Sequence, residues 1–208
     1  GYRSGAWSFE QNTRYETMTD RYQLMGRNIE EAKKGAAVLM LEARTVLEEE
    51  KTYADARRRL RTTRFMAPHY FILAGSGAYE GAVMTVPAAE DYPLYNMRLL
   101  SSTQWYLVQT NDDWEGPAMD TRRQIANTFM SYHRPYDSSS GSSNSSSSSK
   151  SAMELAMRVW PVCNVNTVFT WYMSAATGMD YVVDDKCGKQ NRRLRQPTGD
   201  ESLMPRLG

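Results

Sequence analysis

Apolar and polar residues alternate near the beginning of the chain, in residues 5–15, where Trp7 and Phe9 lie on the same side of the alternation. This period of two predicts a half-buried strand that follows a glycine-containing turn. Over residues 30–51 the apolar positions recur at helical spacing instead, which predicts a helix whose start Gly35 weakens.

A second helix is expected to begin at Thr52, because the order Thr52-Tyr-Ala-Asp55 is similar to a capping box, with Asp in place of the usual Glu or Gln. This helix should end before Pro68, which cannot continue it. The short gap between the two helices predicts that they pack as a pair.

After Pro68 the pattern changes to short apolar runs. The runs at residues 69–75 and 80–86 are separated by a turn at Ser76–Ala78, which predicts a hairpin. Further strands are predicted at residues 92–99, 104–110, 165–174 and 179–183, and helices at residues 120–133 and 151–160. Antiparallel strands with clustered helices indicate an α+β layered domain.

Two segments lack the apolar residues that a packed element needs. Residues 138–149 hold ten Ser, one Gly and one Asn, which predicts a flexible surface insertion. Residues 184–208 are polar and are predicted to form a disordered tail. The domain is therefore expected to span residues 1–183.

Composition and charge exclude several classes of protein. The 208 residues carry 25 Lys and Arg against 24 Asp and Glu, so a protein built around wrapping nucleic acid is not expected. No apolar run approaches the roughly 18 residues of a membrane span. The two cysteines, Cys163 and Cys187, allow at most one bridge; Cys163 is expected in the core and Cys187 as an exposed thiol, with a bridge as the minor option.

Other residue clusters have ordinary explanations. The arginines of residues 57–64 spread around a helix just after Glu48–Glu50, which favours a solvated face with local ion pairs over an RNA-binding stripe. His69 and His133 have no partners at metal-ligand spacing, so structural or surface roles are expected and no metal or cofactor site is predicted.

Candidate chemistry lies at the end of the predicted strand 104–110. Asn111 follows this strand, and Arg122 lies at the start of the next helix. An asparagine there can donate its amide hydrogens to a developing oxyanion, and an arginine can orient a carbonyl or carboxylate. The alternative is a polar turn at Asn111–Asp113 and a solvated Arg122, because these residue types are also common in turns.

Several motifs in chain order resemble those of the acid ceramidase and N-acylethanolamine acid amidase family of N-terminal-nucleophile hydrolases. The strand ending in Asn12-Thr-Arg resembles the family's Asn-Glu-Arg-Phe strand, and Ala67-Pro-His-Tyr-Phe-Ile-Leu-Ala-Gly75 with Glu80-Gly81 resembles its Ala-Pro-x-Tyr-Phe-Ile-x-x-Gly…Glu-Gly hairpin. Gln109-Thr-Asn111 resembles its Val-Gln-Thr-Asn segment, and Arg122-Arg123 falls where its Asp-Asp-Arg-Arg motif is expected. Residues 44–56 and 165–174 resemble its helix pair and its late strand.

The resemblance implies an αββα sandwich, incomplete at its N-terminus, and the C-terminal part of a hydrolase that cleaves the amide bond of a ceramide or N-acylethanolamine. In that family a cysteine at a new N-terminus is the nucleophile. Asn111 would match the oxyanion asparagine and Arg122 an arginine of the catalytic network, with Asn12 as a second amide near the oxyanion. The resemblance also implies a lysosome-like acidic compartment or secretion, and transient contact with a lipid surface.

The matching nucleophile would lie upstream of Gly1, so the chain alone is expected to be inactive and to need an N-terminal segment or subunit as its partner. Asp112 and Thr121 depart from the family pattern and change the charge near the site. The alternative is therefore a catalytically inactive family member that acts as a scaffold or regulatory module.

Overall fold

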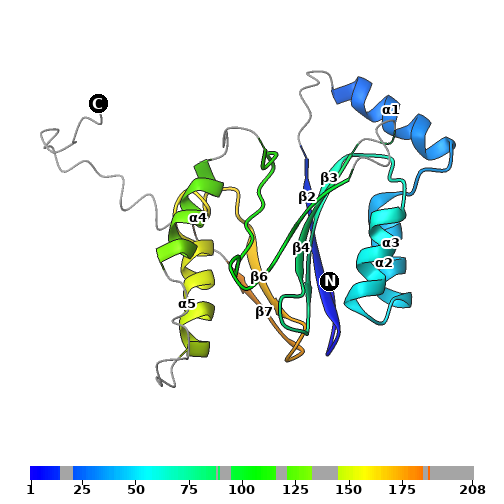
Figure 1. The fold of residues 1–208 in the computed structure, drawn as a ribbon. Coiled ribbons are helices and arrows are strands. Elements are labelled where there is room, and N and C mark those ends of the chain that lie inside the picture. The colour runs from blue at the N-terminus through cyan, green and yellow to red at the C-terminus, as the bar shows by residue number, and fades with distance from the viewer. Residues whose placement is uncertain are drawn as a thin grey trace, which may run out of the picture.

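The computed structural model describes residues 1–14, 21–87, 89, 95–115, 121–132, 145–184 and 187. Two helix pairs enclose two antiparallel sheets (Figure 1). The helices are α1 (Arg21–Lys33), α2 (Leu39–Glu49), α3 (Tyr53–Thr62), α4 (Thr121–Tyr132) and α5 (Ser145–Arg158). The strands are β1 (Tyr2–Arg3), β2 (Trp7–Thr13), β3 (His69–Gly75), β4 (Gly81–Val86), β5 (Asn96–Leu99), β6 (Phe169–Ser174) and β7 (Met179–Asp184).

The layers follow the order of an αββα sandwich. The pair α2 and α3 covers one side of the five-stranded sheet β1-β2-β3-β4-β5; the two-stranded sheet β6-β7 lies on the other side, followed by α4 and α5 (Figure 1). The two sheets contact each other where the Gly5 amide donates to the Ala175 carbonyl at 2.8 Å. The predicted α+β class and layered sandwich are confirmed.

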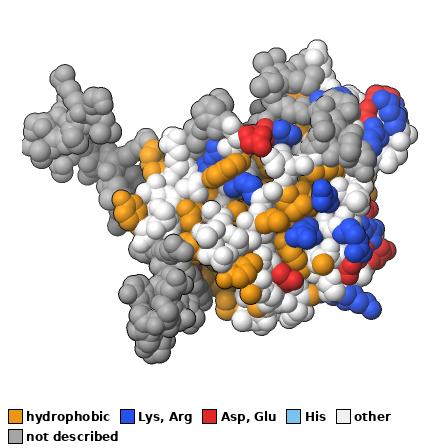
Figure 2. Space-filling view, in the orientation of Figure 1, with side chains coloured by type: hydrophobic (Ala, Val, Ile, Leu, Met, Phe, Trp, Pro, Cys, Tyr) orange, Lys and Arg blue, Asp and Glu red, His pale blue; other side chains and the backbone are white. Residues whose placement is uncertain are grey.

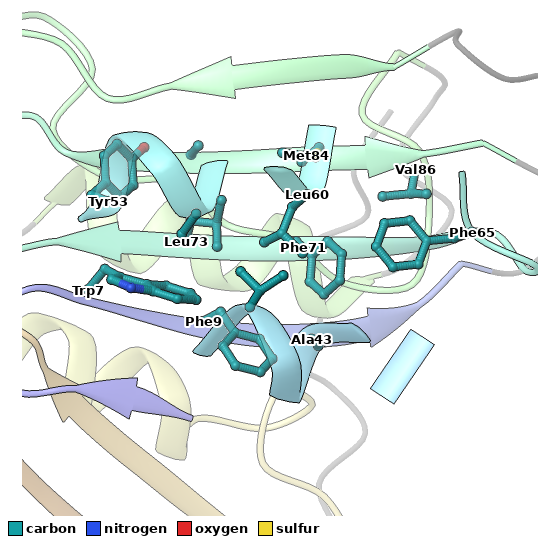
Figure 3. Close-up of a cluster of buried hydrophobic side chains, with 13 residues drawn as sticks. Trp7, Phe9, Ala43, Tyr53, Leu60, Phe65, Phe71, Leu73, Met84 and Val86 are labelled. Carbon is teal, nitrogen blue, oxygen red and sulfur yellow. The ribbon is translucent and has the colours of Figure 1, made fainter. Parts of the chain in front are cut away.

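Alternation along the central strands separates the two faces of the large sheet. The register pairs Phe9 with Leu73 and Phe71 with Met84, so these apolar side chains share the face toward α2 and α3. Figure 3 shows them packed against Leu60 and other helix residues in one buried cluster. The opposite face, here called the inner face, has the alternate positions of the same strands and looks toward β6 and β7.

A helix cap and a set of ion pairs stabilise the pair α2 and α3. Thr52 caps α3 by accepting a hydrogen bond from the Asp55 amide at 3.1 Å, as the sequence predicts. Arg59 of α3 forms ion pairs with Glu42 at 3.0 Å, with Glu50 at 3.3 Å and with Glu49. This arginine is thus used in local ion pairs, as expected for the basic run.

Three predicted elements differ from the structure. The expected helix 30–51 is two helices, because Gly35 adopts a left-handed backbone with φ of 89° and ends the first one. Residues 104–110 form no ladder with another described strand; their carbonyls accept hydrogen bonds from side chains instead. Helix α5 begins at Ser145, inside the serine tract, rather than near Ser151.

The other predicted elements have the predicted type in the structure. Three further predictions concern residues that the structure does not describe. Residues 138–144 of the serine tract, most of the tail and His133 lie outside the described residues. The prediction of an exposed Cys187 thiol is wrong. Cys187 is buried and forms a disulfide with Cys163, with their Cα atoms 5.4 Å apart, because burial against the body of the domain brings the two residues together.

His69 is fully buried at the start of β3, which confirms its structural role. Its Nδ1 donates to the Ala67 carbonyl at 2.9 Å, and the rings of Phe65 and Phe71 pack against it, 4.8 and 4.5 Å away between centroids. The Nε2 atom has no hydrogen-bond partner among the described residues. Burial therefore lowers the pKa of His69 to about 4.

This lowered pKa predicts a loss of stability in acid. Between about pH 6.5 and pH 4 the unfolded chain binds a proton at this histidine and the folded chain does not, so the free energy of unfolding falls as the pH falls. By about pH 5 the loss should reach about 2 kcal/mol. Urea unfolding at about pH 7 and pH 5 should show this extra loss in the natural protein and not in His69→Phe; equal losses in both would contradict the prediction.

Candidate active site

The candidate site lies at the end of β2, on the inner face of the large sheet. Residues 104–115 cross this face: the part near Trp105 and Val108 packs against α4 and α5, and the part from Gln109 onward is bonded to the sheet. These two anchors explain why the segment is extended without joining a ladder. They also bring the predicted site residues together.

Asn111 lies between the sheet and α4. Its side-chain Nδ2 donates to the Thr13 carbonyl at the end of β2, at 2.8 Å, and its Oδ1 accepts from Arg122 Nη2 at 2.9 Å. Asn12 on β2 donates from Nδ2 to the Gln109 carbonyl at 3.2 Å. Asn12, Asn111 and Arg122 therefore meet at one place in the fold. The second amide hydrogen of Asn111 is not bonded to any described residue.

Asp113 anchors the same segment from the other side. Arg14 donates to both of its carboxylate oxygens, from Nε at 2.8 Å and Nη2 at 2.7 Å, and the Tyr70 hydroxyl donates to Oδ1 at 2.7 Å. These bonds, led by the one from Arg14, lower the pKa of Asp113. Burial, and then the Asp113 carboxylate, raise the pKa of Tyr70, which keeps its hydroxyl protonated as a donor.

Arg123, adjacent to Arg122, has a different environment. It is 2% exposed, donates to the Asp113 carbonyl at 2.7 Å and pairs with the Asp112 carboxylate at 3.1 Å. Its guanidinium also lies 5.5 Å from the ring centre of Trp114. The two adjacent arginines thus have different roles: Arg122 donates a hydrogen bond to Asn111, and Arg123 holds the loop that contains Asn111.

The sequence did not reveal three contributors to the site. Arg14 directly follows β2, Tyr70 lies on β3 and Arg98 on β5, and only the register of the sheet places them beside residues 108–113. Alternation along β2 and β3 could have assigned Asn12 and Tyr70 to one face. Nothing in the spacing could have assigned Arg98 to Val108.

Metal binding and membrane crossing receive no support from the described part of the chain. It contains no group of three or more His, Cys, Asp or Glu side chains placed to hold a metal ion. None of its helices combines the length and apolar character needed to cross a bilayer.

Comparison with known proteins finds acid ceramidases among the relatives of this chain by sequence. No family model matches the chain. Its sequence is 33% identical to acid ceramidase of Heterocephalus glaber over 132 residues, which is 62% of this chain and 33% of that protein. It is 29% identical to acid ceramidase of Pan troglodytes over 180 residues, which is 86% of this chain and 42% of that protein. The chain thus spans between a third and about two fifths of the length of these relatives.

The fold has a solved counterpart. The structure of a Caenorhabditis elegans N-acylethanolamine-hydrolyzing acid amidase ortholog superposes with a TM-score of 0.68 and covers 88% of this chain and 75% of that chain at 24% sequence identity. By sequence the chain is therefore similar to acid ceramidases, and its fold is shared with an N-acylethanolamine-hydrolyzing acid amidase ortholog.

Proposed function

We propose that the chain is the C-terminal part of a hydrolase that cleaves the amide bond of a fatty-acyl amide, a ceramide or an N-acylethanolamine, with a cysteine nucleophile upstream. One observation carries the proposal: the fold brings Asn12, Asn111 and Arg122 together at the inner face through hydrogen bonds of 2.8 to 3.2 Å. The relatives, named as a ceramidase and an acid amidase, support amide hydrolysis as the reaction.

The proposed reaction proceeds in two steps. The free α-amine of the cysteine takes the thiol proton, and the sulfur attacks the amide carbonyl carbon. The carbonyl oxygen becomes an oxyanion that accepts a hydrogen bond from the second amide hydrogen of Asn111. The tetrahedral intermediate collapses to a thioester, and the released amine takes a proton from the α-ammonium of the cysteine. Water then hydrolyses the thioester and releases the fatty acid.

Arg122 supports this role through Asn111. Its guanidinium holds the Asn111 Oδ1, while the Thr13 carbonyl holds one of the two amide hydrogens. The amide plane is therefore fixed before substrate binds, and the free hydrogen has a set direction. Donors that need no rearrangement during the reaction are the ones that lower its barrier.

An uncovered apolar surface supports an N-terminal segment or subunit as partner. One face of the β6–β7 hairpin presents Phe169, Trp171 and Val182, which are 56%, 39% and 58% exposed, while Tyr172 on the opposite face is 6% exposed. Hydrophobic side chains reach the surface across the middle of the face shown in Figure 2. We propose that the upstream segment with the cysteine adds to this two-stranded sheet and covers it.

The disulfide indicates the redox conditions in which the protein is located. Disulfides such as Cys163–Cys187 persist in oxidising surroundings and are rare where thiols are kept reduced. The proposed location is therefore a lysosome-like acidic compartment or the exterior of the cell, and transient contact with a lipid surface would deliver the substrate. The His69 effect implies that the domain loses some stability in such an acidic compartment.

Turnover of a fluorogenic fatty amide tests the proposal. The full-length processed protein should release the fluorophore, and the same protein with the upstream cysteine replaced by alanine should not; the chain of residues 1–208 alone should also be inactive. If the full-length folded protein gives no turnover with ceramide or N-acylethanolamine substrates, the scaffold alternative stands in place of the enzyme.

A further inference from the structure

A cavity of about 300 Å³ lies beside the candidate site, at the edge of the large sheet. Its wall is mixed: apolar surface comes from Leu99, Leu107, Val108 and the Trp114 ring, Arg98 of β5 contributes a guanidinium, and the other lining residues are Gln104, Tyr106 and Asn127. This volume is at the lower end of the range for small-molecule sites, which are typically apolar with a few fixed polar groups.

Arg98 has no acidic partner among the residues that the structure describes. Its Nη2 donates to the Val108 carbonyl at 3.0 Å and to Gln109 Oε1 at 2.6 Å, while its Nε and Nη1 make no hydrogen bond to a described residue. No carboxylate of the described chain lies within ion-pair distance of it. Arg123, the nearby cation, is by contrast paired with Asp112.

The guanidinium is also fixed in place. It lies 4.4 Å from the ring centre of Trp114, and its two hydrogen bonds go to the backbone and side chain of the loop. Burial, and then the positive charge of Arg123, lower the pKa of Arg98 to about 10, so it stays charged at neutral and acidic pH. This guanidinium is half-buried, fixed in position and without a carboxylate partner among the described residues. It is suited to bind an anionic group, because its Nε and Nη1 make no hydrogen bond to a described residue and can donate to a ligand.

We propose that this cavity binds an amphiphilic carboxylate, with the carboxylate on Arg98 and the apolar tail along Leu99, Leu107 and Trp114. The inference rests on the guanidinium, which has no carboxylate partner among the described residues, and on the apolar side chains of the lining, and it does not depend on amide hydrolysis. If the proposed function is also correct, a fatty acid released by the reaction belongs to the class of molecule that this cavity would hold.

Decanoate binding to the full-length protein, measured by titration calorimetry, tests the proposal without turnover. Decanoate should bind, and decanol, which has the same chain without the charge, should bind roughly tenfold more weakly. Arg98→Gln should weaken decanoate binding by roughly tenfold or more and leave decanol binding unchanged. The matched control is Arg58→Gln on α3, whose side chain is 72% exposed, and it should bind decanoate as the natural protein does.

A second variant covers the case in which Arg98→Gln does not fold. Leu99 is 48% exposed on β5, so Leu99→Glu should fold and should abolish decanoate binding by charge repulsion. Unchanged decanoate affinity in either folded variant would overturn the proposal, as would equal affinity for decanoate and decanol. Displacement of decanoate by equimolar inorganic phosphate would also overturn it, because phosphate has no tail to contact the apolar wall.

Discussion

Replacing Asn111 by alanine in the full-length protein is expected to lower its turnover of a fatty-acyl amide by roughly 10²- to 10³-fold, the usual cost of one oxyanion donor. The Asn111 amide donates one hydrogen to the Thr13 carbonyl and leaves the other without a partner among the described residues, and Arg122 fixes its oxygen. Because the donor acts on charge that develops only in the transition state, kcat should fall while KM changes little.

Steady-state kinetics on purified Asn111→Ala and on a control will check this expectation. Asn166→Ala is the control, because Asn166 is an exposed asparagine in the loop before β6. It should keep the natural rate. A correctly folded Asn111→Ala protein that retains more than about a third of the natural kcat would remove Asn111 from the proposed mechanism, whatever its effect on stability.

The second large effect concerns stability, and it separates two neighbouring arginines. Arg123→Ala should lower the free energy of unfolding by about 3 kcal/mol, because it leaves the Asp113 carbonyl and the Asp112 carboxylate without their buried partner. Arg122→Ala, at a half-buried position, should cost about 1 kcal/mol or less in stability, while it lowers turnover through Asn111.

Urea unfolding of both variants, with activity measured on the same samples, will test the roles assigned to Arg122 and Arg123. Arg123→Lys should recover part of the lost stability, since a lysine keeps the charge near Asp112 but cannot form the same set of hydrogen bonds. A loss of less than 1 kcal/mol in Arg123→Ala, or a larger loss in Arg122→Ala than in Arg123→Ala, would contradict the assigned roles.

Local patterns predicted the elements whose stability comes from their own residues. The apolar run at residues 69–75 matches β3, and the Thr52 cap marks the start of α3, because burial and capping are both readable from neighbouring positions. Residues 104–110 carry the same apolar pattern and form no ladder. Their backbone partners are the side chains of Asn12 and Arg98, and no local pattern reports such contacts.

The same distinction applies to the candidate site, of which some residues could be predicted from the sequence and others could not. Asn111 and Arg122 could be proposed from the sequence because the residues that resemble the family motifs keep their order and spacing. Arg14, Tyr70 and Arg98 could not, because the strand register alone brings them to the loop. The disulfide was also missed as the favoured state, since the burial of Cys187 depends on the packing of the whole domain.

The hydrogen bond from Asn111 to Thr13 joins residues 98 positions apart, and the one from Asn12 to Gln109 spans 97. Closing so long a loop costs entropy that only the packed sheet between them can offset. No short fragment of the chain can therefore form this site, and a single proteolytic cut that let the two parts separate would abolish it. The geometry of the amide is a property of the assembled domain, and it should appear late in folding, after the central strands have paired.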